Sequence, residues 1–133
     1  MNLFLDASAI VSMIVREPDA EELADRLDDP DRLLWSAVAK WEAVAAVARL
    51  RRYETPVFAR NDIDNFGNTY ALELVPIGVH ESDLAFSAFE RYGKGSGHPA
   101  QLNMGDCFAY ACARANNARL LYKGDDFSHT DLA

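Results

Sequence analysis

Five acidic residues of the 133-residue chain stand beside strongly apolar segments, where carboxylates are rare unless they are paired or bind a ligand. Asp6 follows an apolar run at the N-terminus, Glu42 lies inside an alanine-rich segment, and Asp106 is at the start of another. The adjacent pair Asp125 and Asp126 follows the last apolar run of the chain. Carboxylates that converge without neutralising bases repel one another, so a shared site for them requires a cation.

Oxygen ligands select hard divalent cations such as Mg²⁺ or Mn²⁺. One or two of these ions can activate water and stabilise the charge that develops on a phosphate under in-line attack. The reaction that such a site favours is the hydrolysis of a phosphodiester bond.

Each acid also has a purely structural interpretation. Asp106 can be a capping charge at a helix start, which the positive end of the helix dipole favours. Glu42 can form a buried ion pair with Lys40 or an arginine, because a buried glutamate needs either a partner or a cation.

Other chemistries fit the sequence less well. A dehalogenase-type phosphatase needs a second aspartate two positions after the first, and Ser8 follows Asp6 at that distance. The glycine-rich segment 93–99 lacks the Lys-Ser or Lys-Thr ending of a phosphate-binding P-loop. The three histidines are widely separated, which disfavours a metal-free ribonuclease and, with two cysteines, a zinc site.

Length and composition favour one globular domain over residues 1–133. The sequence shows neither a membrane-spanning run nor a secretory leader, so we expect a cytoplasmic protein without membrane contact. Cys107 and Cys112 lie five apart on one expected helix and point to different sides, so we expect two buried, reduced thiols.

The net charge of −8 does not exclude a nucleic-acid partner, because the negative charge is concentrated. Segment 17–31 carries eight of the 21 acids and a single base, Arg26. The remaining 13 acids face 12 bases, so most of the chain is close to neutral.

The hydrophobic pattern predicts strands that alternate with helices, which is typical of a three-layer α/β/α sandwich with a central, mainly parallel sheet. In such sheets the ligand site lies beyond the carboxyl ends of the strands, where Asp6 and the later aspartate pair would lie. Thr55 followed by Pro56 predicts a helix start, and Ser82 and Asn103 are expected to cap two later helices. We expect strands at 2–5, 32–36, 74–77 and 119–122, and helices at 7–15, 20–27, 37–52, 57–72, 80–92 and from 104 onward.

Four stretches carry a family resemblance: the strand ending in segment 5–9, Glu42 in the helix after the second strand, segment 102–110, and segment 123–131. In these stretches the chain resembles the PIN-domain family and, within it, the VapC-type toxins of bacterial toxin-antitoxin pairs. Together they span nearly the whole chain, and the last two are the most specific.

The resemblance implies a PIN-like fold and a Mg²⁺- or Mn²⁺-dependent endoribonuclease with Asp6, Glu42 and Asp106 as metal ligands. It also implies one further acid from the last motif, where this chain offers Asp125 and Asp126. Side chains alternate at a strand exit, so we expect one of the two to face the metal, and we favour Asp125. Ser8, Asn103 and Thr130 are the residues that the resemblance suggests for orienting the ligands.

The family further implies a homodimer, a cognate antitoxin that covers the acidic site, and an RNA substrate, in particular a structured RNA such as tRNA. Two other functions stay open: a PIN-like nuclease that acts on DNA or in RNA processing without a toxin role, and a non-catalytic interaction module. Candidate phosphate contacts are Lys40, Arg49, Arg51, Arg52, Lys94 and Lys123.

Overall fold

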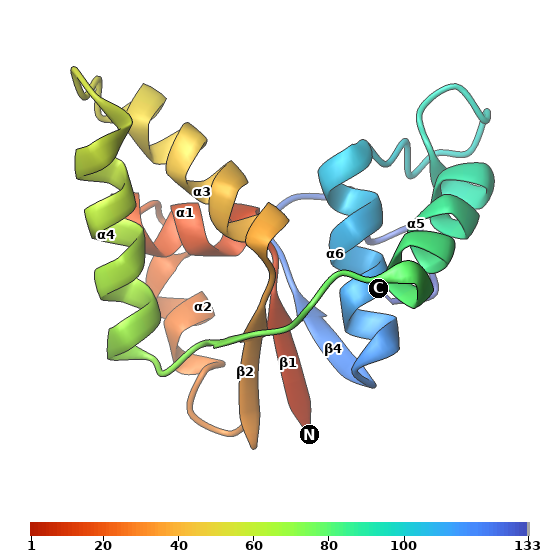
Figure 1. Ribbon diagram of the computed structural model, residues 1–133, viewed down its shortest axis with the longest axis horizontal. Coiled ribbons are helices and arrows are strands. Elements are labelled where there is room, and N and C mark those ends of the chain that lie inside the picture. The colour runs from red at the N-terminus through yellow and green to blue at the C-terminus, as the bar shows by residue number, and fades with distance from the viewer. Residues whose placement is uncertain (133) are drawn as a thin grey trace.

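The computed structural model describes residues 1–132 and contains a four-stranded, fully parallel sheet with helices on both faces (Figure 1). This confirms the expected α/β/α sandwich. The strands are β1 (Asn2–Leu5), β2 (Arg32–Trp35), β3 (Glu73–Leu74) and β4 (Ala118–Leu121). The helices are α1 (Ala7–Val15), α2 (Ala20–Asp25), α3 (Ala37–Leu50), α4 (Pro56–Thr69), α5 (Val79–Tyr92) and α6 (Met104–Ala115).

Alternate residues of the central strands belong to two separate hydrophobic cores, one on each face of the sheet. Phe4 and Leu120 belong to the core that α5 and α6 cover, whereas Leu5 and Leu121 belong to the core under α1 to α4. Successive side chains of a strand point to opposite faces, so a strand buried on both sides reads as a continuous apolar run. All four side chains are at most 4% exposed.

The strand order β3-β2-β1-β4 determines where a crevice opens at the carboxyl ends of the strands. Helices α1 to α4 connect the first three strands on one face, and α5 and α6 then lead the chain back over the other face to β4 (Figure 1). β4 pairs with β1, so the connections diverge to opposite faces between these two strands. In parallel sheets such a switch point forms a crevice at the carboxyl ends of the strands.

Three local expectations were wrong. α4 ends at Thr69 because Ala71 takes a left-handed backbone with a φ of 51°. β3 is shorter than expected, since Pro76 has no N–H to continue the ladder. α5 begins at Val79 and is capped by the Glu81 side chain, which accepts a 2.8 Å hydrogen bond from the Gly78 N–H, in place of Ser82.

The cysteines behave as expected. Cys107 and Cys112 are free and buried, and burial raises the pKa of each thiol to about 11. Both thiols therefore stay protonated and unreactive near neutral pH. Among the helices of residues 1–132, none combines the length and the apolar composition needed to cross a bilayer.

Candidate active site

Asp6 lies at the carboxyl end of β1 and is 5% exposed. Its backbone N–H donates to the Leu121 carbonyl of β4 over 2.9 Å, which holds it at the switch point. As the N-cap of α1, its Oδ2 accepts from the Ser8 N–H at 3.0 Å and from the Ser8 hydroxyl at 2.5 Å. Burial raises the pKa of Asp6, although the hydrogen bonds from Ser8 oppose this.

The Ser8 hydroxyl joins Asp6 to the segment after β4. Besides donating to Asp6, its oxygen accepts a 2.9 Å hydrogen bond from the Lys123 N–H. The Lys123 ammonium contacts Glu17 and lies 3.6 Å from Asp19 Oδ1. The orientation of the buried carboxylate therefore depends on a loop that a surface ion-pair cluster anchors.

Glu42 projects from α3 and is half-buried. The expected alternative, an ion pair with Lys40, is not formed, because Lys40 contacts Asp64 at 2.7 Å and lies over the Trp35 ring. Burial, together with the charges of Asp6 and Asp106, raises the pKa of Glu42 to about 7. An acid with this pKa and no neutralising base among residues 1–132 favours a cation as its partner.

Asp106 is the third residue of α6 and takes part in a capping box, as the helix-start signal predicted. Its N–H donates to Asn103 Oδ1 over 2.9 Å, and its Oδ2 accepts from the Asn103 N–H over 3.1 Å. Its pKa is raised to about 6, first by burial and then by the charges of Asp6 and Asp126, while the hydrogen bond from Asn103 and the charge of Lys94 oppose the rise.

Gly105 brings α6 close to the Glu42 carboxylate. A Cβ at position 105 would lie 2.1 Å from Glu42 Oε2, far inside van der Waals contact. The sequence suggested that Gly105 leaves the helix start open, but it did not show that the space is taken by an acid from α3.

The last motif contributes Asp126 more directly than Asp125. The charge of Asp126 raises the pKa of both Asp6 and Asp106, whereas Asp125 affects neither. Thr130 is used inside its own turn: its hydroxyl donates to the Phe127 carbonyl at 2.8 Å and accepts from the Leu132 N–H. Asp126 therefore acts by its charge on Asp6 and Asp106, whereas the Thr130 hydroxyl is directed into its own turn.

A cleft of about 680 Å³ opens beside Glu42, the one of these acids that lines it. It lies between the first turns of α1, the exposed face of α3 and the segments before α6 and after β4. Glu42, Ser8 and Asn103 form part of its wall, and Trp41 and Arg49 lie along its α3 side.

Within residues 1–132, no three acidic, histidine or cysteine side chains are gathered closely enough to form a ready-made metal site. Mutual repulsion is a physical reason for carboxylates to stay apart without a cation between them. The donor set nevertheless fits a hard divalent cation, because it consists of carboxylates whose charges oppose one another and because Glu42 has no cationic partner in the described chain.

The candidate phosphate contacts divide into two groups. Lys40, Arg51 and Lys123 each form an ion pair with an acid. In the described part of the chain, Arg49, Arg52 and Lys94 form none, and Arg49 lines the cleft. Arg49 is therefore the best placed of these cations to meet a phosphate.

Residues 3–132 match the family model described as the PIN domain. A VapC ribonuclease of Rhizobium meliloti is 45% identical over 139 aligned residues, which cover 97% of this chain and 98% of that protein. Ribonuclease VapC42 of Mycobacterium tuberculosis is 34% identical over 130 residues, with 98% and 96% of the two chains covered.

Solved structures show the same fold. The crystal structure of VapC20 from Mycobacterium tuberculosis, a sarcin-ricin loop cleaving toxin, has a TM-score of 0.73 at 13% identity and covers 95% of this chain and 92% of that one. VapBC-1 from nontypeable Haemophilus influenzae has a TM-score of 0.72 at 16% identity, with 97% and 92% covered. By sequence and by fold, the chain belongs to the PIN-domain family and, within it, to the VapC ribonucleases.

Proposed function

We propose that this protein is a divalent-metal-dependent endoribonuclease, the toxin of a toxin-antitoxin pair, formed by one nuclease domain over residues 1–133. The observation that carries the proposal is Glu42, whose pKa is raised to about 7 opposite two other acids and which has no base beside it in the described chain. A carboxylate in this setting is stabilised by a divalent cation.

Asp6, Glu42, Asp106 and Asp126 would hold the cation, with Asp126 in place of the expected Asp125 because its charge acts on two of the other acids. When bound, Mg²⁺ or Mn²⁺ would activate water and stabilise the charge on the phosphate.

Two residues of the chain orient these carboxylates. Ser8 fixes the Asp6 carboxylate by its hydroxyl and its N–H, and Asn103 fixes Asp106 through the capping box. The burial of both aspartates keeps water away from one side of the site. Arg49, at the cleft, can attract the phosphate backbone of the substrate.

The substrate that we propose is a structured RNA, such as tRNA. The VapC20 toxin, which shares the fold, cleaves the sarcin-ricin loop, and this supports a structured RNA for the present chain by analogy. We expect the protein to act in the cytoplasm, where such RNAs are found.

We also propose a cognate antitoxin and a homodimer. Support for the antitoxin comes from the structure of a toxin-antitoxin complex from Klebsiella pneumoniae, with a TM-score of 0.66. Support for the homodimer comes from the family and from an exposed apolar face at α5 and α6, which includes Phe86, Phe89 and Met104 beside a groove of about 540 Å³.

The test is cleavage of a total small-RNA pool by the purified, antitoxin-free protein with Mg²⁺, with Mn²⁺ or with EDTA. We expect discrete products that require the metal and disappear in folded Asp6→Asn and Asp106→Asn variants. Asp28→Asn is the matched control, because Asp28 is exposed in the segment before β2, outside the cleft, and this variant should cleave like the wild type. Intact RNA under all conditions would overturn the proposal and favour a DNA substrate or a binding module.

A further inference from the structure

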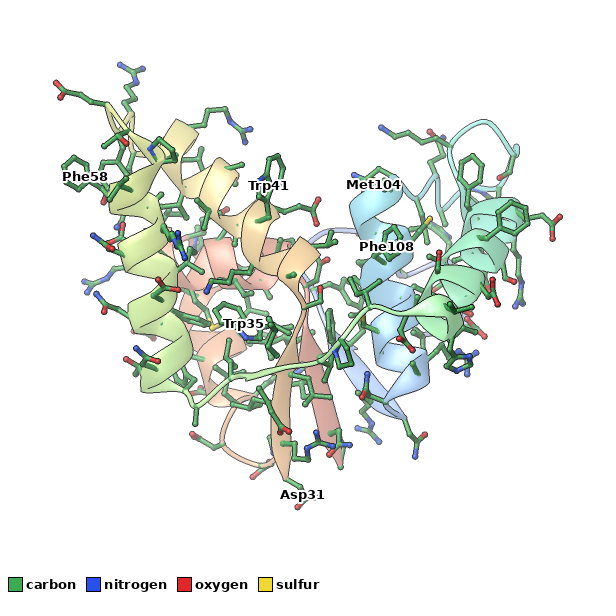
Figure 2. All side chains as sticks on the ribbon, viewed as in Figure 1. Asp31, Trp35, Trp41, Phe58, Met104 and Phe108 are labelled. Atoms are coloured by element: carbon green, nitrogen blue, oxygen red, sulfur yellow. The ribbon has the colours of Figure 1, made fainter. Side chains whose placement is uncertain are left out.

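Trp41 is a large apolar side chain that the fold leaves uncovered beside Glu42. It is 71% exposed, whereas Trp35, the other tryptophan of the chain, is 5% exposed. Trp41 directly precedes Glu42 in α3 and lines the same cleft. Figure 2 shows it projecting from α3 on the side that faces α6.

Trp41 is followed along α3 by a cation that lines the same cleft. Arg49 lies two helical turns further along α3, about 12 Å along the axis, and it also lines the cleft. Ala45, between them in the sequence, is small and also borders the cleft, so no bulky side chain stands at that position between Trp41 and Arg49. Three neighbouring cations, Lys40, Arg51 and Arg60, are paired with aspartates, but Arg49 has no ion pair among the described residues.

An aromatic ring and an unpaired arginine along one groove are the two parts of a single-strand binding surface. Bases stack on exposed aromatic side chains, and cations follow the phosphate backbone. The reacting phosphate must lie at the carboxylates, so the bases attached to it are within reach of the side chain next to Glu42. A base inside a duplex is stacked on both sides and cannot reach an aromatic ring without leaving the helix.

We propose that Trp41 is a stacking platform for an unpaired nucleobase next to the scissile phosphate, and that Arg49 binds a phosphate further along the same strand. The proposal rests on the proposed function, and it narrows the substrate to RNA that is single-stranded at the cleavage site. It also separates the roles within α3: Glu42 serves the chemistry, and Trp41 and Arg49 hold the strand.

The experiment measures the binding of a short unstructured RNA, and of the same strand annealed to its complement, by an Asp6→Asn protein that cannot cleave it. Stacking on Trp41 should quench the tryptophan fluorescence with the single strand and not with the duplex. Trp41→Ala should weaken single-strand binding about 5- to 150-fold, the range expected for one stacked base, and Trp41→Phe should restore most of it. Phe58→Ala is the control, because Phe58 is an exposed aromatic residue of α4 away from the cleft.

Arg49→Gln should weaken binding. It should also reduce the slope of log K against log salt concentration by about 1, the value expected for the loss of one phosphate contact. In the cleaving protein, Trp41→Ala should raise the KM for RNA more than it lowers kcat. Unchanged binding by Trp41→Ala overturns the proposal, and so does a loss of binding that sedimentation traces to a broken dimer, because Trp41 would then be an interface residue. If single strands quench the Trp41 fluorescence but the wild-type protein cleaves no RNA, the stacking role of Trp41 stands and the proposed nuclease function fails.

Discussion

The Glu42 carboxylate lies against the backbone of Gly105, so that a Cβ at position 105 would come 2.1 Å from Glu42 Oε2. This contact joins α3 to the first turn of α6 and places Glu42 beside Asp106, whose charge contributes to its raised pKa. Gly105 is therefore a requirement of the acidic site, because any side chain here occupies the space of the carboxylate.

Gly105→Ala should leave the protein folded, because the atoms it displaces belong to the end of a flexible side chain. We expect at least a tenfold loss of metal-dependent cleavage, since Glu42 must move. A double-mutant cycle measured by denaturant unfolding checks the cause. In a Glu42→Ala background the same change should be neutral or stabilise by up to about 1 kcal/mol, the helix propensity of alanine over glycine. An equal destabilisation in both backgrounds would locate the clash elsewhere.

The stability of the metal-free protein should depend on pH through Glu42. Its pKa is raised from 4.5 to about 7, so the folded state binds more protons than the unfolded state between these values. The Glu42 contribution to stability is fully present below about 4.5 and is lost as the pH rises through about 7.

The measurement for this prediction is the unfolding free energy of the wild type and of Glu42→Gln in EDTA over that range. We expect the stability of Glu42→Gln relative to the wild type to rise with pH across the window and then to level off. At pH 8, Mg²⁺ should stabilise the wild type more than the variant. A difference that does not change with pH would show that Glu42 has an ordinary pKa.

Asp126 and Asp125 provide a matched pair of substitutions on adjacent residues. Asp126→Asn should weaken Mn²⁺ binding and lower cleavage at least tenfold, because the Asp126 charge acts on Asp6 and Asp106. Asp125→Asn should change both quantities less than twofold. Calorimetric titration and RNA cleavage check the two variants side by side. A larger loss in Asp125→Asn than in Asp126→Asn would favour Asp125 as the metal ligand, as we expected from the sequence.

Ser8→Ala removes a hydroxyl that donates to Asp6 and accepts from the Lys123 N–H. We expect a loss of about 1 kcal/mol in the free energy of unfolding and a larger proportional loss of cleavage. Ser8→Thr keeps the hydroxyl and should retain most of the activity. If Ser8→Ala cleaves RNA at the wild-type rate, the hydrogen bond does not orient Asp6.

The fold, and the places of Asp6 and Asp106 within it, were predictable because their signals are local. Asp6 and Asp106 stand at a strand end and a helix start, and these signals depend on a few neighbouring residues. The contact between Glu42 and Gly105 joins segments far apart in the chain, and nothing near either residue encodes it.

Strand alternation cannot decide between Asp125 and Asp126 because both lie beyond the end of β4, in a turn where alternation no longer applies. Lys123 illustrates the same limit. Its sequence position made it a candidate phosphate contact, but its ammonium forms an ion pair with Glu17, just beyond the C-terminal end of α1. The exposure of Trp41 likewise depends on how α3 packs against the sheet, which its helical spacing alone did not indicate.

The most direct test of the account is a Mn²⁺ titration in which metal binding and RNA cleavage are followed on the same wild-type and Glu42→Gln samples. We expect both curves to reach half-saturation at the same Mn²⁺ concentration in the wild type and to shift together to higher concentration in Glu42→Gln. Cleavage that persists in EDTA, or that is unaffected by Glu42→Gln while metal binding is lost, would contradict it.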